Sequence, residues 1–232
     1  MNKQKHKLFL LICFLGMSAL STQAQRTTDK PNVIFIFADD WGYGDLSAHG
    51  STWIQTPNID KMISGGMDFT DFTVNSPVCS PSRVAVMTGQ FPARQSVHQH
   101  FQGWKAHQNR GMPDWMDVED ISLPREFQKA GYVTAHFGKW HLGSAPDMPN
   151  ETEYGYDEYA TFNGSKSIDI PKAGSVGVDY AESFIMRNKD KPFFINLWLH
   201  EAHLAHFPLE KFMDEFGNLD EQKQVYASVI AE

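Results

Sequence analysis

Residues 31–50 read PNVIFIFADDWGYGDLSAHG and give the clearest indication of the fold class. Residues 32–38 form a continuous apolar run with β-branched and aromatic side chains, which is typical of a buried strand in a parallel sheet. Asp39 and Asp40 follow the run directly and precede a glycine-rich turn. Because ligands in open α/β sheets bind at the carboxyl ends of strands, these carboxylates could bind a hard divalent cation. The alternative is a pair of aspartates that cap a turn or a helix.

The rest of the chain alternates between strand patterns and helix patterns. Further strands are expected at three segments: residues 67–74, 132–138 and 192–199. Helices are expected at five segments: 56–65, 80–89, 122–131, 178–188 and from about residue 219. The first two segments begin with a capping hydroxyl residue followed by a proline. Residues 90–120 and 143–175 are less regular. The pattern predicts an α/β fold with a largely parallel central sheet and helices on both faces.

The composition is that of a globular protein that can bury a core. The chain has 232 residues, of which 41% are hydrophobic and 21% are charged. The formal net charge is −8, whereas a general nucleic-acid-binding protein usually has an excess of basic residues. A nucleic-acid partner is therefore not expected.

The first 24 residues have the pattern of a secretory signal peptide. Lys3, Lys5 and Lys7 precede the apolar run Leu8–Leu20, and the small residue Ala24 follows a short polar stretch. The run is too short to span a bilayer, so no stable membrane anchor is expected. We therefore predict a secreted or periplasmic protein cleaved after Ala24. Removing three lysines and no acid leaves 17 Lys and Arg against 28 acidic residues, a net charge of −11.

Cys79 is the one cysteine outside this leader, because Cys13 lies within the apolar run. It opens the sequence Cys-Ser-Pro-Ser-Arg, just before a helix that is expected to start at Ser80 and Pro81. Free backbone N–H groups and the helix dipole favour an anion at such a position, and Arg83 lies one turn further along. The alternative is an inert buried thiol.

Two further clusters also follow predicted strands. Lys139 and His141 are two residues apart, so in an extended segment they would share one face. A cation beside an imidazole suits an anionic substrate and proton transfer, although a surface lysine and an ordinary histidine would look the same. His200, His203 and His206 follow residues 192–199. A three-histidine zinc site is one interpretation, but one histidine acting on a substrate fits the spacing better.

Taken in order, these motifs resemble those of the type I sulfatases, the formylglycine-dependent arylsulfatase family of the alkaline-phosphatase superfamily. The resemblance runs from about Lys30 to the end of the chain, with Ala202 at a position where proline is common in the family. The matching blocks are residues 31–50, SPVCSPSRVAVMTGQFPAR at 76–94, AGYVTAHFGKWHLG at 130–143, GYDE at 155–158 and HEAHLAHFP at 200–208. The resemblance implies an alkaline-phosphatase-like fold.

The resemblance also implies a chemistry. A maturation enzyme would oxidise Cys79 to formylglycine, whose hydrated aldehyde attacks sulfur with one hydroxyl and releases the sulfate with the help of the other. Ca²⁺ would be bound by Asp39, Asp40 and the residue at position 79. Arg83 would hold the diol and His141 would assist its deprotonation. The substrate sulfate would be bound by Lys139 and His203, with His203 protonating the leaving group and His200 as a weaker alternative.

The implied function is hydrolysis of sulfate esters on a sulfated small molecule or glycan. A phosphonate or phosphodiester hydrolase of the same superfamily is an alternative, and an inactive truncated remnant is another. Family members carry a second metal-binding pair beyond this point. Residues 25–232 are therefore expected to be the N-terminal portion of a catalytic domain whose C-terminal part is missing, and to be inactive alone.

Overall fold

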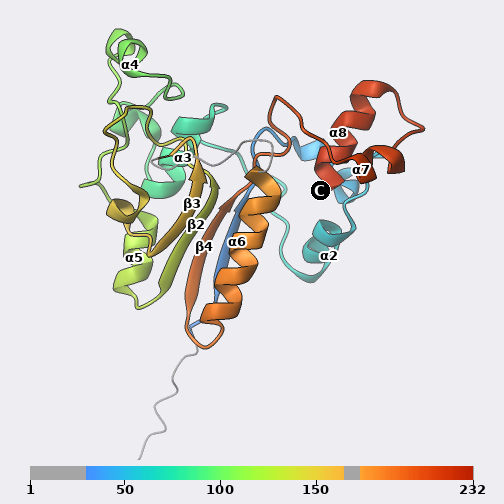
Figure 1. Ribbon diagram of the computed structural model, residues 1–232, viewed down its shortest axis with the longest axis horizontal. Helices are drawn as coiled ribbons and strands as arrows, with labels where there is room; N and C mark the ends of the chain where they lie inside the picture. The colour runs from blue at the N-terminus through green and yellow to red at the C-terminus, as the bar shows by residue number, and fades with distance from the viewer. Residues whose placement is uncertain (1–29, 165–172, 232) are drawn as a thin grey trace, which may run out of the picture. The chain divides into compact units, whose positions relative to one another are not determined.

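The computed structural model of the protein describes residues 30–164 and 173–231 (Figure 1). The expected signal peptide, residues 1–24, lies outside the described residues. Within them, no helix combines the length and the apolar character needed to cross a bilayer.

A four-stranded parallel sheet forms the centre of the fold, with the strand order β1-β4-β2-β3. The strands are β1 (Val33–Phe37), β2 (Val133–Lys139), β3 (Glu158–Phe162) and β4 (Phe193–Trp198). The predicted α/β fold with a parallel sheet is thereby confirmed. All six residues of β4 are buried, because this strand has a neighbour on each side and helices on each face.

Strand β1 is an edge strand of the described sheet. Its residues alternate between half-buried and exposed, and Ile34 and Ile36 are 45% and 50% exposed. The prediction of a strand here is right, but the prediction that it is buried throughout is wrong. A continuous apolar run does not distinguish a central strand from an edge strand, since only the neighbouring chain segments decide which one it becomes.

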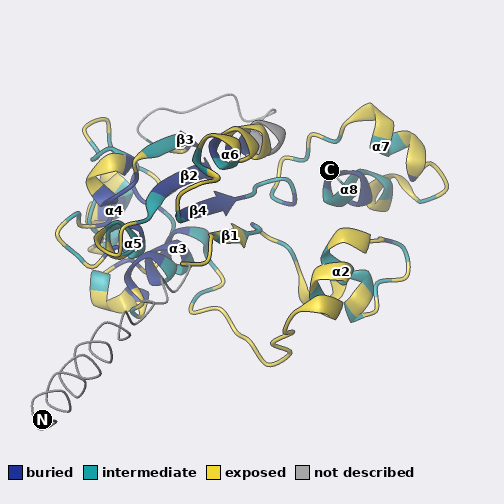
Figure 2. Cartoon of the chain, turned by 90° about the horizontal axis from the view of Figure 1, so that it is seen from below, coloured by how far each residue is buried: buried dark blue, intermediate teal, exposed yellow. Residues whose placement is uncertain are grey.

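Helices cover both faces of the sheet, as predicted. Helix α6 (Ala173–Asn188) packs on one face, and α3 (Cys79–Thr88) and α5 (Leu123–Lys129) lie on the other (Figure 2). Phe184 of α6 joins an apolar cluster with Phe137 and Ile195, whereas Met87 of α3 joins a larger cluster with Trp140 and Trp198. Each face of the sheet therefore has its own core.

The remaining elements are short. They are the 3-10 helices η1 (Tyr43–Asp45), η2 (Ser47–His49), η3 (Pro92–Gln95) and η4 (Glu151–Tyr154), and the α-helices α2 (Pro57–Gly65), α4 (Trp104–Arg110), α7 (Glu210–Glu215) and α8 (Glu221–Ala231). A third, small apolar cluster joins Ile54 to Phe216 and to Ala227 of α8.

Residues 67–74 form no strand, contrary to the prediction. Met67, Phe69 and Phe72 are 76%, 68% and 76% exposed, and the segment consists of turns and irregular backbone. Alternating apolar residues form a strand only where another strand edge pairs with their backbone, and no described strand pairs with these residues. Strand β3, by contrast, lies in a region that the sequence left irregular.

Helix α3 begins at Cys79, with Val78 as its N-cap, rather than at a cap formed by Ser80. Pro81 is the third helical residue, where its missing N–H costs nothing, because the first-turn N–H groups have no partner inside the helix. The hydroxyl of Ser80 is bonded to other segments of the chain. Cys79 therefore lies within the first turn of α3.

Candidate active site

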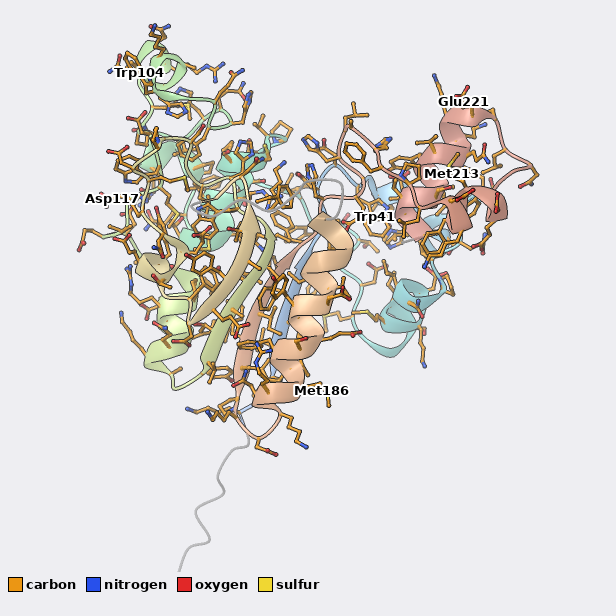
Figure 3. All side chains as sticks on the ribbon, viewed as in Figure 1. Trp41, Trp104, Asp117, Met186, Met213 and Glu221 are labelled. Atoms are coloured by element: carbon orange, nitrogen blue, oxygen red, sulfur yellow. The ribbon has the colours of Figure 1, made fainter. Side chains whose placement is uncertain are left out.

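The predicted site residues gather at one edge of the sheet. Asp39 and Asp40 follow β1, Lys139 ends β2, and His200 follows β4. All four strands are parallel, so their carboxyl ends meet at the same edge, and the N-terminus of α3 brings Cys79 to it. Trp41 marks the place where the chain leaves β1 (Figure 3).

A cleft of about 870 Å³ opens at this edge. Five of the predicted residues line it: Cys79, Lys139, His141, His200 and His203. The other lining residues are His100, Asn163, Leu204, Ala205 and Phe207. Asp39, Asp40 and Arg83 do not line the cleft, although each of them lies against a residue that does.

Cys79 and His141 form a pair. The half-buried thiol lies 3.3 Å from Nδ1 of His141. Nε2 of the same ring lies 2.9 Å from the carbonyl oxygen of Phe101, which can only accept, so Nε2 carries the proton of a neutral ring. Burial, together with the charges of Lys139 and Arg83, lowers the pKa of His141 to about 4. His141 is therefore neutral near pH 7 and directs an unprotonated nitrogen at position 79.

Asp39 is the centre of the buried charges beneath the cleft. Its carboxylate is 6% exposed and pairs with the ammonium of Lys139, with Arg83 at 3.4 Å and with Nδ1 of His200 at 3.2 Å. Burial alone would raise the pKa of Asp39, but the bond from His200 and the charges of Arg83 and Lys139 hold that pKa well below its usual range. The Asp39 side chain is therefore a carboxylate at any ordinary pH.

Arg83 is fully enclosed. Besides Asp39, its guanidinium donates to the backbone carbonyl of Lys139 at 3.0 Å and lies over the ring of Trp198, 4.8 Å from the ring centroid. In this arrangement Arg83 fixes the end of β2 relative to the end of β1.

Asp40 differs from its neighbour. Its side chain is 59% exposed, its φ of 58° lies in the left-handed region, and one of its oxygens lies 3.7 Å from Nε2 of His203. Carboxylate oxygens are the ligands that calcium prefers, so Asp39 and Asp40 fit the expected cation by donor type, although calcium takes six to eight oxygens. Among the described residues, one group of possible metal ligands has its donor atoms within 4.8 Å of one another: Asp39, His200 and His203. The two histidine nitrogens of this group suit calcium less well than oxygens do.

The three-histidine zinc arrangement is not formed. His206 donates to the carbonyl of Ala202 at 3.0 Å and packs near the ring of Tyr226, whereas His200 and His203 stack on each other with ring centroids 4.4 Å apart. Only two of the three histidines therefore share a site.

Lys139 and His141 reach the same cleft for a different reason from the one predicted. Strand β2 ends at Lys139, Trp140 is fully buried, and His141 adopts a φ of 54°. A left-handed turn, rather than strand alternation, brings His141 to Cys79.

Two polar residues of the cleft were not found from the sequence. His100 follows η3, and its ring centroid lies 6.2 Å from that of His141. Asn163 follows β3 and has a φ of 52°. Its backbone carbonyl accepts a hydrogen bond from the backbone N–H of His141 at 3.0 Å. Both lie in segments without a periodic pattern, so only the folded chain shows that they face the site.

Comparisons with known proteins bear on the family of this chain. Residues 31–231 match the family model described as Sulfatase. The chain is 40% identical over 117 residues to human arylsulfatase A (Homo sapiens), covering 50% of this chain and 22% of that protein. It is 32% identical over 213 residues to the N-acetylgalactosamine-6-sulfatase of the dog (Canis lupus familiaris), covering 86% of this chain and 38% of that protein.

A solved structure shares the fold as well. It is described as a complex of a protein with its substrate D-glucosamine-2-N,6-O-disulfate, and it matches with a TM-score of 0.64 and 27% identity. The match covers 82% of this chain and 38% of that chain. The chain spans 22% to 38% of the length of the curated relatives it matches. With a family match over residues 31–231, the chain belongs to the sulfatase family.

Proposed function

We propose that the protein hydrolyses sulfate esters, and that this chain supplies the nucleophilic position, its base and the groups that hold the sulfate. The observation that carries the proposal is the Cys79–His141 pair at 3.3 Å, in a cleft that Lys139, His200 and His203 also line. A nucleophile within reach of a base, beside cationic or hydrogen-bond-donating groups, is the arrangement that transfer of an anionic group requires.

The five predicted residues that line the cleft then each have a role. Nδ1 of His141 accepts the proton of the group at position 79, since Nε2 is already bonded to Phe101. The first-turn N–H groups of α3 and the ammonium of Lys139 favour negative charge beside that group. His203, which is partly exposed in the cleft, is placed to bind sulfate and protonate the leaving alcohol, with His200 as the alternative.

Two groups implied by the family fit these residues. Formylglycine formed from Cys79 by a maturation enzyme would supply a hydroxyl nucleophile in place of the thiol, at an atom that already faces His141. Calcium held by Asp39, Asp40 and position 79 would supply positive charge that offsets the charge of the sulfate. Arg83 would support that site through its contact with Asp39.

The proposed substrate is a sulfated glycan. Two observations support this choice. One relative and one solved structure are described by the name of an amino sugar, and the cleft volume is in the range of small-molecule sites. A sugar substrate also agrees with export by the leader at residues 1–24, which would make the protein secreted or periplasmic. Residues 25–232 would then be the N-terminal portion of the catalytic domain.

The test compares two proteins side by side: these 232 residues and the product of the complete reading frame. Each is produced together with a formylglycine-generating enzyme, and mass spectrometry measures conversion of Cys79. Turnover of an aryl sulfate and of an aryl phosphodiester is then measured, with Cys79→Ala as the control. We expect conversion of Cys79, faster turnover of the sulfate by the complete product, and no turnover by the 232 residues alone.

The alternatives predict different results. Faster turnover of the phosphodiester would identify a phosphonate or phosphodiester hydrolase of the same superfamily. No turnover by a complete product whose Cys79 is converted would identify an inactive remnant. Turnover that persists in Cys79→Ala would reject the proposed nucleophile.

A further inference from the structure

Every polar atom of His141 has a partner, and the partners come from three separate segments. The backbone N–H donates to Asn163 at 3.0 Å, and the backbone carbonyl accepts the hydroxyl of Ser80 at 2.8 Å. In the ring, Nε2 donates to the carbonyl of Phe101 at 2.9 Å, and Nδ1 faces the thiol of Cys79 at 3.3 Å. His141 is thus fixed in both its backbone turn and its ring orientation.

The turn needs such support. A φ of 54° places His141 in the left-handed region, which is unfavourable for an L-residue other than glycine because its Cβ approaches a carbonyl oxygen of the backbone. Residues held in such a conformation persist where the surrounding structure enforces it, and they concentrate at functional sites.

Ser80 connects two of the supports through one atom. Its side chain is fully buried, and its Oγ donates to the carbonyl of His141 while it accepts the N–H of Phe101 at 3.1 Å. The same Phe101 peptide segment supplies the carbonyl that holds the ring. A single hydroxyl therefore sets the distance between the backbone of His141 and the acceptor for its Nε2–H.

Helix capping does not explain this serine. Val78 is the N-cap of α3, and Ser80 is the second residue of the helix. Its hydroxyl is bonded to the segment after β2 and to the segment after η3, rather than to the N–H groups of its own helix.

We propose that Ser80 is a positioning residue whose hydroxyl keeps His141 in the Nε2–H tautomer, with Nδ1 directed at position 79. Without the hydroxyl, the buried N–H of Phe101 and the carbonyl of His141 lose this partner, and the segments they belong to can separate. The carbonyl oxygen of Phe101 is then no longer held in line with Nε2 of the His141 ring, and the Nδ1–H tautomer becomes populated. The consequence for catalysis rests on the proposed function, whereas the tautomer itself does not.

The test measures the tautomer of His141 by long-range ¹H–¹⁵N NMR on the ¹⁵N-histidine-labelled chain with unconverted Cys79. We expect the wild type to show the Nε2–H form at pH 7. In Ser80→Ala, the ratio of the Nε2–H to the Nδ1–H form should fall about 3- to 10-fold, the equivalent of one neutral hydrogen bond. Because no turnover is involved, the result is independent of whether the proposed function holds.

Thr88→Val is the matched control. Thr88 lies in the same helix and is buried, and its hydroxyl likewise donates to a carbonyl, that of Val84 at 2.8 Å, and accepts an N–H, that of Gln90 at 3.2 Å. Its removal should leave the tautomer ratio of His141 unchanged. An equal fall in Thr88→Val and Ser80→Ala would mean general loosening of α3 and would overturn the proposal.

Two further results would also overturn the proposal: an Nδ1–H form in the wild type, or an unchanged ratio in Ser80→Ala. If Ser80→Ala does not fold, Ser80→Cys decides the question, because its thiol fills similar space but is a weaker donor. A lower ratio in Ser80→Cys than in the wild type supports the role of Ser80, and an unchanged ratio rejects it.

Discussion

Asp39 and Asp40 are adjacent in the chain, but their carboxylates have opposite environments. The side chain of Asp39 is 6% exposed and pairs with Lys139, Arg83 and His200. The side chain of Asp40 is 59% exposed, and one of its oxygens lies 3.7 Å from Nε2 of His203. The strand end therefore places one carboxylate in the core as a structural anion and presents the other to solvent.

The first prediction follows from this difference. Asp39→Asn should lower the free energy of unfolding by about 3 to 5 kcal/mol, because Lys139 and Arg83 would remain buried without their counterion. Asp40→Asn should change it by less than about 0.5 kcal/mol, because the side chain is exposed and asparagine tolerates positive φ. Urea unfolding of both variants measures the effect, and equal stability of the two would contradict it.

The second prediction concerns Gly138. It pairs with Trp198 in the sheet at a φ of 102°, and a Cβ at this position would lie 2.1 Å from the carbonyl oxygen of Trp198. Gly138→Ala should therefore destabilise the chain by about 3 kcal/mol or more. Gly44→Ala is the control, because a Cβ there meets nothing within 4 Å. A Gly138→Ala variant as stable as Gly44→Ala would show that β2 and β4 separate easily at this point.

The third prediction is a pH dependence of stability. His136 is fully buried among the rings of Trp140, Tyr156 and Trp198, and burial lowers its pKa to about 3. The unfolded chain binds this proton near pH 6.5, whereas the folded chain does not until about pH 3. Stability from His136 is therefore complete above pH 6.5 and is lost as the pH falls toward 3.

The measurement is the free energy of unfolding at pH 7 and pH 4.5. His136→Phe, which keeps an aromatic ring, should reduce the wild-type difference between the two pH values by roughly 2 to 3 kcal/mol. His141, with a pKa of about 4, contributes over the same range and remains in this variant. The exposed His98→Gln should keep the wild-type difference. An unchanged difference in His136→Phe would mean that His136 titrates alike in the folded and unfolded chains.

The fourth prediction tests the proposed sulfate site with inorganic sulfate. His203→Gln should weaken sulfate binding about 10- to 150-fold at pH 7, the loss expected for one hydrogen bond to an anion. His206→Gln should leave sulfate binding unchanged, because His206 does not line the cleft and its ring donates to the backbone carbonyl of Ala202. NMR titration gives both dissociation constants. Equal weakening in both variants would reject a specific contact by His203.

The sequence predicted the boundaries of β1, β2 and β4 to within one or two residues. Apolar runs of this length bounded by turn residues usually form buried strands in an α/β chain. It missed β3, whose five residues Glu158–Phe162 are too short and mixed to stand out. It also predicted a strand at residues 67–74 that the described structure lacks. Both errors have one cause, since strand formation depends on a pairing edge that lies elsewhere in the chain.

The sequence by itself determined which residue types lie at the ends of the strands, and hence the family to which the chain belongs. Parallel strands carry their carboxyl ends to one edge, so Asp39, Lys139 and His200 had to approach one another in any such fold. Only the tertiary structure decided what each group does there. Burial made Asp39 the counterion of Lys139 and Arg83, and a left-handed turn held by Ser80 directed Nδ1 of His141 at Cys79. Burial and hydrogen-bond direction depend on atoms from distant segments, and the order of residues along the chain does not contain them.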